Sequence, residues 1–265
     1  MKIPLTPPER QQLLALTLAL LIACFGPALA QHPHYHAFAD QRSGWGLPCV
    51  MDVLSNLPFA LGGLWGWLVL QRWPAEPVPG VQRPLARLFF AGLVLTALCS
   101  GYYHWQPDNA GLLLDRLGMV LAFAGLLGLA AAERISLRAG GATAGAVLLL
   151  GPLAVAVWAV SGNLLPWVLL QGGGMLLLVW LATCPPQPGA WGVPLGLVIG
   201  LYALAKALEL GDHLVFAWTQ GAVSGHSLKH AVAALVVWPF IQVMHNAAHG
   251  QPLARPPTSL GQGGV

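Results

Sequence analysis

Three histidines with the chemistry of metal ligands stand at the ends of apolar segments: His104, His226 and His230. His226 and His230 are four residues apart, so they share one face of a helix. Three neutral imidazoles are a ligand set for zinc that leaves a fourth coordination position open, as catalytic zinc sites do. Ser100 precedes His104 by four residues, and Asp115 follows on the next apolar segment. A purely structural zinc site needs neither side chain, so this set favours hydrolytic chemistry.

The composition places these residues in a membrane protein. Mean hydropathy is +0.67 and only 8% of the residues are charged, whereas soluble domains carry about 25%. We therefore predict an all-α, polytopic membrane protein. Ionisable groups are costly inside a bilayer and usually mark function there. The sequence has no run of basic residues that would predict nucleic-acid binding, and its four cysteines show no CxxC spacing.

Eight apolar stretches approach the length of about 20 residues that a membrane span needs. They cover residues 13–30, 53–71, 86–104, 112–131, 142–160, 163–183, 191–210 and 226–246. The connections between them are short, which predicts one seven-transmembrane-helix bundle over residues 32–250. A hydrophobic segment, residues 1–31, precedes this domain, and a polar tail, residues 251–265, follows it.

The first apolar stretch has two interpretations. Lys2 and Arg10 precede a short apolar run, and Ala28-Leu29-Ala30 before Gln31 resembles a signal-peptide cleavage site. The segment is therefore either an extra retained helix or a cleaved signal peptide. The seven later spans keep the same orientation in both cases.

Basic residues favour one side of the predicted bundle. Alternate connections carry Arg72, Arg83, Arg87, Arg134 and Arg138, on the side of Lys2, Arg10 and Arg255, whereas the opposite loops hold Asp40, Arg42, Asp52, Asp108 and Asp212. The positive-inside rule then puts both termini in the cytoplasm. We expect a protein of the bacterial inner membrane whose three histidines share one depth near the outer, periplasmic face.

Other histidines in the chain have simpler interpretations. His245 and His249 repeat the four-residue spacing at the predicted cytoplasmic end without an acid nearby, which is typical of a solvated helix end. His32, His34 and His36 stand in an outer loop, where they are either an opportunistic metal site or, by preference, a plain polar loop.

Three charged residues lie near the outer end of the seventh apolar stretch: Lys206 and Glu209 within it and Asp212 just after it. Lys206 and Glu209 are three residues apart, which suits an intrahelical ion pair. The alternative is that all three are hydrogen-bond partners that orient the zinc ligands, as partners of metal-bound histidines commonly do.

The set Ser100-Gly-Tyr-Tyr-His104, Asp115 and His226-x3-His230 resembles the alkaline ceramidases, part of a wider superfamily of seven-helix membrane hydrolases that includes adiponectin-receptor-like proteins. The stretch Asp52-Val-Leu-Ser-Asn56-Leu-Pro is similar to an N-terminal signature of that family. The resemblance spans about residues 40–246. It implies Zn2+ on the three histidines, completed by Ser100 and Asp115.

The same resemblance implies a substrate. The family cleaves the amide bond of ceramide, so the expected partner is a membrane lipid, ceramide or another N-acyl lipid, which is hydrolysed to a fatty acid and an amine-bearing lipid. Some members also bind Ca2+ through an acidic cluster before the first core helix. Here Asp40 and Asp52 are the candidate calcium ligands, and most of the other acids of that cluster are absent.

Two rival functions remain at this stage. One is a receptor-like protein of the same superfamily in which zinc is structural. The other is a transporter with a proton relay of histidine and aspartate, although the polar groups gather at one face and the chain shows no inverted repeat.

Overall fold

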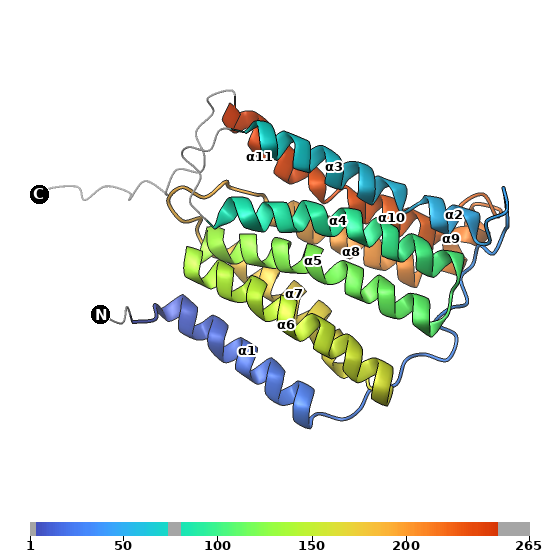
Figure 1. Cartoon of the computed structure of the whole chain (residues 1–265), viewed down its shortest axis with the longest axis horizontal. Coiled ribbons are helices and arrows are strands. Elements are labelled where there is room, and N and C mark those ends of the chain that lie inside the picture. The colour runs from blue at the N-terminus through green and yellow to red at the C-terminus, as the bar shows by residue number, and fades with distance from the viewer. Residues whose placement is uncertain (1–3, 74–80, 249–265) are drawn as a thin grey trace, which may run out of the picture.

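The structure, a computed structural model, describes residues 4–73 and 81–248, and in this part of the chain every regular element is a helix (Figure 1). The predicted all-α class is therefore confirmed for these residues. The predicted tail, residues 251–265, and His249 lie outside them. The helices are α1 (Pro7–Phe25), α2 (Val50–Leu54), α3 (Leu57–Arg72), α4 (Gln82–Trp105), α5 (Asn109–Arg134), α6 (Leu137–Ser161), α7 (Leu165–Thr183), α8 (Leu195–Leu210), α9 (Asp212–Trp218), α10 (Gly225–Ala234) and α11 (Val237–Ala248).

Six helical segments of the described chain are long and apolar enough to cross a membrane, which supports a polytopic membrane protein. They are Val50–Arg72, Gln82–Trp105, Asn109–Arg134, Leu137–Ser161, Leu165–Thr183 and Gly225–Asn246. Six of the eight predicted stretches coincide with one helix each, and the stretches 53–71 and 226–246 with two helices each. However, α8 has only 16 residues, and α1 carries the polar run Glu9-Arg10-Gln11-Gln12 near its start. The seven-span count thus stays a prediction, with α8, packed along α10, as the seventh member.

Prolines divide two of the spans. The α2–α3 break falls at Ser55 and Asn56, and the α10–α11 break at Leu235 and Val236. Pro58 and Pro239 each lack the N–H that would bond to the carbonyl four residues earlier, and each ring clashes with that carbonyl. The helices therefore restart, and the N-terminal half of each divided span lies at the end of the bundle that carries the histidines.

Close contact of backbones fixes α4 against α5. A Cβ on Gly92 would lie 2.2 Å from the backbone N of Ala122, and one on Gly125 would lie 2.3 Å from the backbone N of Phe89. Neither position tolerates a side chain, so small residues allow the helix axes to approach as they do in membrane bundles. The Thr96 hydroxyl also donates to the Gly118 carbonyl at 3.3 Å. This packing sets the register of the two antiparallel helices.

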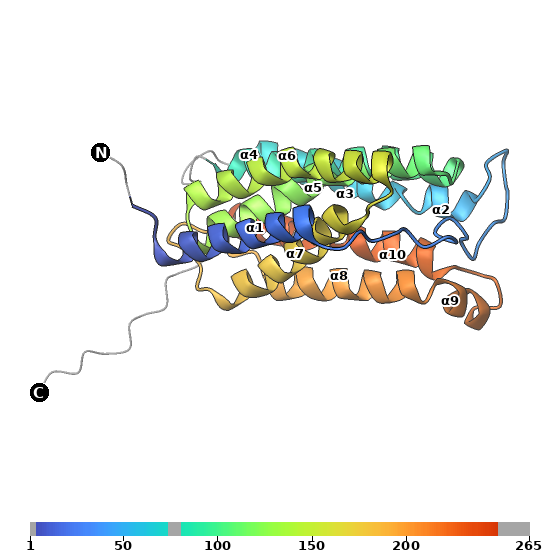
Figure 2. The same ribbon diagram turned by 90° about the horizontal axis from the view of Figure 1, so that it is seen from below.

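The arrangement of the ends agrees with the predicted topology. In Figure 1 the start of α1 and helix α11 lie at one end of the bundle, whereas α2, α9 and the start of α10 lie at the other. Figure 2 shows α8 along the edge opposite α4 and α6, with α7 and α10 between them. The end with α9 and the start of α10 gathers the predicted outer loops.

Helix α1 is tied to the bundle at both of its ends. Glu9 forms an ion pair with Arg138 at 2.6 Å and accepts a hydrogen bond from Ser136 at 2.7 Å. After the helix, the Leu29 carbonyl accepts from the backbone N–H of Leu164 at 2.7 Å, and its N–H donates to the Asn163 side chain at 3.0 Å. These contacts favour the retained helix over the cleaved signal peptide.

We predict that protein purified from membranes keeps residues 1–30, because Glu9 of α1 pairs with Arg138 on α6 and Leu29, after the helix, bonds to the turn before α7. Intact-mass spectrometry and N-terminal sequencing check this. A mature protein that begins at Gln31 would show that the segment is a signal peptide.

Candidate metal centre

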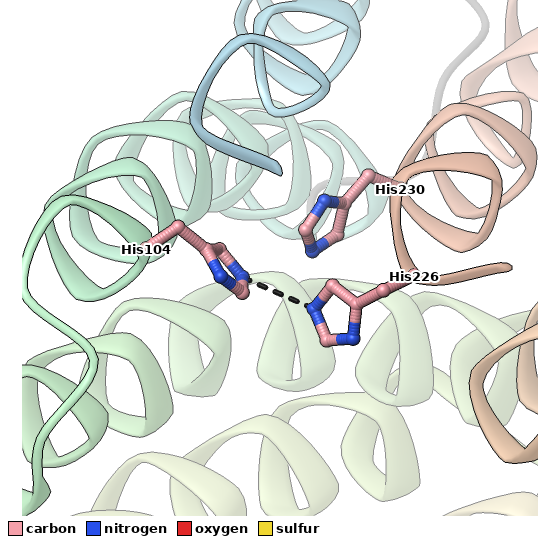
Figure 3. Close-up of side chains that lie close together, drawn as sticks. All are labelled: His104, His226 and His230. Carbon is pink, nitrogen blue, oxygen red and sulfur yellow. Dashed lines mark hydrogen bonds between the residues drawn. The ribbon is translucent and has the colours of Figure 1, made fainter. Parts of the chain in front are cut away.

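The three predicted histidines converge. His104 stands in the last turn of α4, and His226 and His230 stand in the first turns of α10. Their rings point toward one another (Figure 3), with centroids 4.7, 5.0 and 4.9 Å apart. The Nε2 atoms of His104 and His226 are 3.1 Å apart, and one ring nitrogen of each residue lies within 4.8 Å of the other two. All three side chains are buried.

This geometry fits a zinc ion. Two nitrogens held about 2.0–2.1 Å from one tetrahedral zinc lie roughly 3.3 Å apart, close to the 3.1 Å between the Nε2 atoms of His104 and His226. Three buried imidazoles that face one point cannot all satisfy one another by hydrogen bonds, and a shared metal ion would satisfy the nitrogens that face it. Within residues 4–73 and 81–248, this is the one group of three or more His, Cys, Asp or Glu side chains close enough to share a metal.

Ser55 orients one ligand. The Ser55 hydroxyl donates a hydrogen bond to the backbone carbonyl of Asp52 at 2.9 Å. Its oxygen therefore accepts one from Nδ1 of His230 at 2.7 Å. His230 then carries its proton on Nδ1 and presents the lone pair of Nε2 to the other two rings. Such a partner fixes the tautomer and the orientation of a metal-bound histidine. Sequence reasoning missed this role, although Ser55 lies within the motif at the start of the second predicted span.

Buried carboxylates position the start of α10. Asp212, predicted as a supporting residue, accepts from the backbone N–H of His226 at 2.8 Å and from that of Ala39 at 2.9 Å. Asp52 accepts from the hydroxyls of Ser224 and Ser227 at 3.2 and 2.7 Å. Anionic side chains at a helix N-terminus satisfy its free N–H groups and its dipole. These contacts hold the backbone that carries His226 and His230.

Ser100 and Asp115 form a pair across the α4–α5 interface. Ser100 is buried one turn below His104, on the same side of α4. Its hydroxyl lies close enough to the half-buried carboxyl group of Asp115 on α5 to interact with it. The serine and the acid that the sequence associated with the histidines are thus brought together next to His104.

An aromatic ring covers the histidines. Phe38, in the loop between α1 and α2, lies 4.8 Å from the ring centroid of His104 and 4.4 Å from that of His226. His36 anchors this loop, with Nδ1 at 2.8 Å from the Tyr103 hydroxyl and Nε2 at 3.0 Å from the Asn109 side chain. Both ring nitrogens of His36 are therefore engaged. No sequence signal pointed to Phe38, because a single aromatic residue in a loop has no pattern.

The two candidate calcium ligands have other partners. Arg42 binds both carboxylate oxygens of buried Asp40, at 2.8 and 2.6 Å, and holds the pKa of that carboxyl below its usual range. Asp52 uses one oxygen for the two serines, while the other oxygen is buried without a hydrogen-bond partner. The calcium site stays a prediction.

The ion pair expected between Lys206 and Glu209 is present, and a third residue joins it. Glu209 also binds Lys229 on α10, at 2.7 Å. Lys229 lies three residues after His226 and directly before His230. Its charge acts on all three histidine rings and on Asp115. The helical spacing from His226 was the available signal for this residue, which sequence reasoning did not assign.

Comparison with known proteins adds no relative: a scan against models of protein families gives no match, and a search of curated proteins gives none either. The resemblance to the alkaline ceramidases therefore stays a prediction from the residues quoted above.

We predict that Ser55→Ala weakens zinc binding about 10- to 100-fold, the usual effect of removing a hydrogen-bond partner of a metal-bound histidine. Ser161→Ala, the same change at an exposed serine that bonds only to its own helix and the following turn, is the control. Competition with a fluorescent zinc chelator measures both. Equal affinities in the two variants would contradict the role of Ser55.

Proposed function

We propose that this protein is a zinc-dependent integral-membrane amidase that hydrolyses the amide bond of ceramide or a similar N-acyl lipid. The products are a fatty acid and a lipid with a free amine. The observation that supports this best is the convergence of three buried imidazoles beside the Ser100–Asp115 pair. We place it in the bacterial inner membrane, and the charge pattern supports an orientation with both termini cytoplasmic and the site near the outer face.

The three histidines would hold the ion. Zinc, when bound, supplies a Lewis acid that lowers the pKa of a coordinated water toward about 7 and polarises a carbonyl. His104, His226 and His230 would be its neutral ligands, and Ser55 would keep the His230 proton on Nδ1.

Asp115 is placed to move the proton. As water adds to the amide carbon, a carboxylate accepts the proton that water loses, and it then delivers this proton to the amide nitrogen as the C–N bond breaks. The nitrogen leaves as a neutral amine, and the added oxygen stays in the carboxylic acid.

Ser100 has two tasks in this scheme. In the resting site its hydroxyl would donate a hydrogen bond to the nearby Asp115 carboxyl group and so orient it. In the transition state the hydroxyl would donate to the carbonyl oxygen as negative charge develops there, a role that contributes a few kcal/mol in other hydrolases. Burial of Ser100 and the Phe38 ring above the histidines would limit the entry of bulk water.

One experiment tests the metal and the reaction together. The protein is purified in detergent, zinc is measured by elemental analysis, and release of fatty acid is followed from a panel of N-acyl lipids that includes ceramide. We expect about one zinc per chain and its loss in His104→Ala, His226→Ala and His230→Ala, with His34→Ala as the exposed control. Zinc content unchanged by all three substitutions would reject the metal assignment. Zinc without turnover of any amide would favour a receptor-like protein.

We predict that Asp115→Asn lowers kcat by about 10²- to 10⁴-fold, the usual contribution of a general acid–base, and leaves zinc content unchanged. Ser100→Ala should cost about 10²- to 10³-fold, as the loss of one oxyanion donor does. Turnover and metal content are measured on the same preparations. Full activity in Asp115→Asn would remove that residue from the chemistry.

A further inference from the structure

A short segment of the loop between α1 and α2, residues 36–40, crosses the end of the bundle that carries the histidines, and we call it the strap. His36 ties one end of it to α4 and α5, through the Tyr103 hydroxyl at 2.8 Å and the Asn109 side chain at 3.0 Å. The other end of the strap reaches the start of α9, which leads into α10. Because α4 and α10 supply the three histidines, the strap bridges the two helices that form the candidate metal centre.

Two consecutive residues of α9 hold the strap on both sides of Phe38. Nε2 of His213 lies 3.0 Å from the backbone carbonyl of Ala37. Because a carbonyl oxygen can only accept, this ring nitrogen carries the proton and donates. One carboxylate oxygen of Asp212 accepts from the backbone N–H of Ala39 at 2.9 Å. The residues before and after Phe38 are thus both fixed, and we call Asp212 and His213 the latch.

The Asp212 carboxylate also joins the strap to a metal ligand. Its second oxygen accepts from the backbone N–H of His226 at 2.8 Å. Asp212 is buried, so the two N–H groups offset part of the cost of burying its charge. A movement of the strap that breaks the bond to Ala39 would remove one of these two partners. The latch therefore favours the closed strap.

Phe38 lies between the surface of the molecule and the histidine rings. Ala37 is exposed and Ala39 is half-buried, so the backbone of the strap lies at the surface. Phe38 between them is only 6% exposed. Its ring turns inward, with its centroid 4.4 Å from that of His226 and 4.8 Å from that of His104. An apolar ring in contact with two ligand rings leaves no room for water between them.

We propose that Phe38 closes the metal centre to water-soluble molecules at this end of the bundle, and that it thereby selects amides delivered by the bilayer over amides dissolved in water. Asp212 and His213 hold this closure. A dissolved amide would have to break the two hydrogen bonds of the latch to reach the histidines. The selection of substrate rests on the proposed amidase function, whereas the closure concerns the histidines alone and is measurable without metal or turnover.

Chemical labelling of the histidines tests the closure. Zinc-free, EDTA-treated protein in a nonionic detergent reacts with diethyl pyrocarbonate, which acylates accessible neutral imidazoles, and mass spectrometry follows each histidine. Exposed His34 is the internal reference. In the wild-type protein His104 and His226 should react about tenfold more slowly than His34 or slower still, because buried groups react only through local opening.

Two matched variants assign the protection to the strap. Phe38→Ala should raise the labelling rate of His104 and His226 about tenfold or more, because the strap loses its buried ring and opens more often. Phe59→Ala is the control: Phe59 is also a buried ring beside a ligand, with its centroid 6.1 Å from that of His230, but it belongs to α3 and to the bundle core. Labelling should stay slow in Phe59→Ala, since the strap remains in place.

The latch is tested by a change at an exposed side chain, which leaves the buried core intact. His213→Ala removes one hydrogen bond of the latch and should raise labelling of His104 and His226 roughly two- to tenfold, the net contribution of one hydrogen bond. Phe38→Leu keeps an apolar side chain in the strap and should stay close to the wild-type rate. Thermal unfolding is recorded for every variant.

Three results would overturn the closure. In the first, His104 and His226 of the wild-type protein react as fast as His34. In the second, Phe38→Ala labels no faster than the wild type. In the third, Phe59→Ala labels as fast as Phe38→Ala, which would show general loosening of the bundle.

Substrate selection is measured on zinc-loaded protein. The ratio of kcat/KM for water-soluble N-butanoylethanolamine to that for N-palmitoylethanolamine should rise about tenfold in Phe38→Ala and stay constant in Phe59→Ala. An unchanged ratio in Phe38→Ala would overturn the selection. If the protein binds no zinc or cleaves no amide while the labelling differences persist, the closure stands and the amidase function is wrong.

Discussion

The close approach of α4 and α5 is the constraint on which the rest of the site depends. At Gly92 and Gly125 each helix backbone occupies the space that a side chain of the other would need. Backbone contact of this kind leaves no freedom to slide, because a shift of one residue would bring side chains into the interface. The register that results places Ser100 opposite Asp115 and raises His104 to the end of the bundle. Helix packing far from the histidines thus decides where one zinc ligand and both proposed catalytic groups lie.

A polar network completes the site from the other side. Asp212 and Asp52 receive hydrogen bonds from the first turn of α10, and Ser55, at the proline-induced break between α2 and α3, receives one from His230. Unpaired polar atoms in an apolar bundle cost several kcal/mol, so these hydrogen bonds offset part of the cost of burying the two carboxylates. The helix break therefore has a function. At the break the backbone carbonyl of Asp52 accepts a hydrogen bond from the Ser55 hydroxyl, while the Asp52 carboxylate reaches Ser227 on α10. Glu209 and Lys229 join α8 to the same helix.

Much of the fold and of the histidine site could be predicted from the sequence, and the features that could not be predicted have physical reasons. The helices and the grouping of His104, His226 and His230 follow from apolar length and from the alternation of helix direction, which puts all three at one depth. The number of membrane spans was harder to predict, because α8 is shorter than a typical span and α1 has a polar first turn. Phe38, Ser55 and the Asp52–serine contacts depend on how loops and helix ends fold back, which periodicity does not encode. Lys229 could not be assigned from the sequence, because its ion pair with Glu209 depends on how α8 packs against α10.

The central claim is that three imidazoles hold one zinc ion at the outer end of this bundle. X-ray absorption at the zinc edge of the purified, unmodified protein tests it most directly. The account predicts a spectrum with imidazole nitrogens about 2.0–2.1 Å from the metal and no sulfur neighbour. A protein that takes up no zinc, or one whose zinc has sulfur ligands at about 2.3 Å, would contradict it.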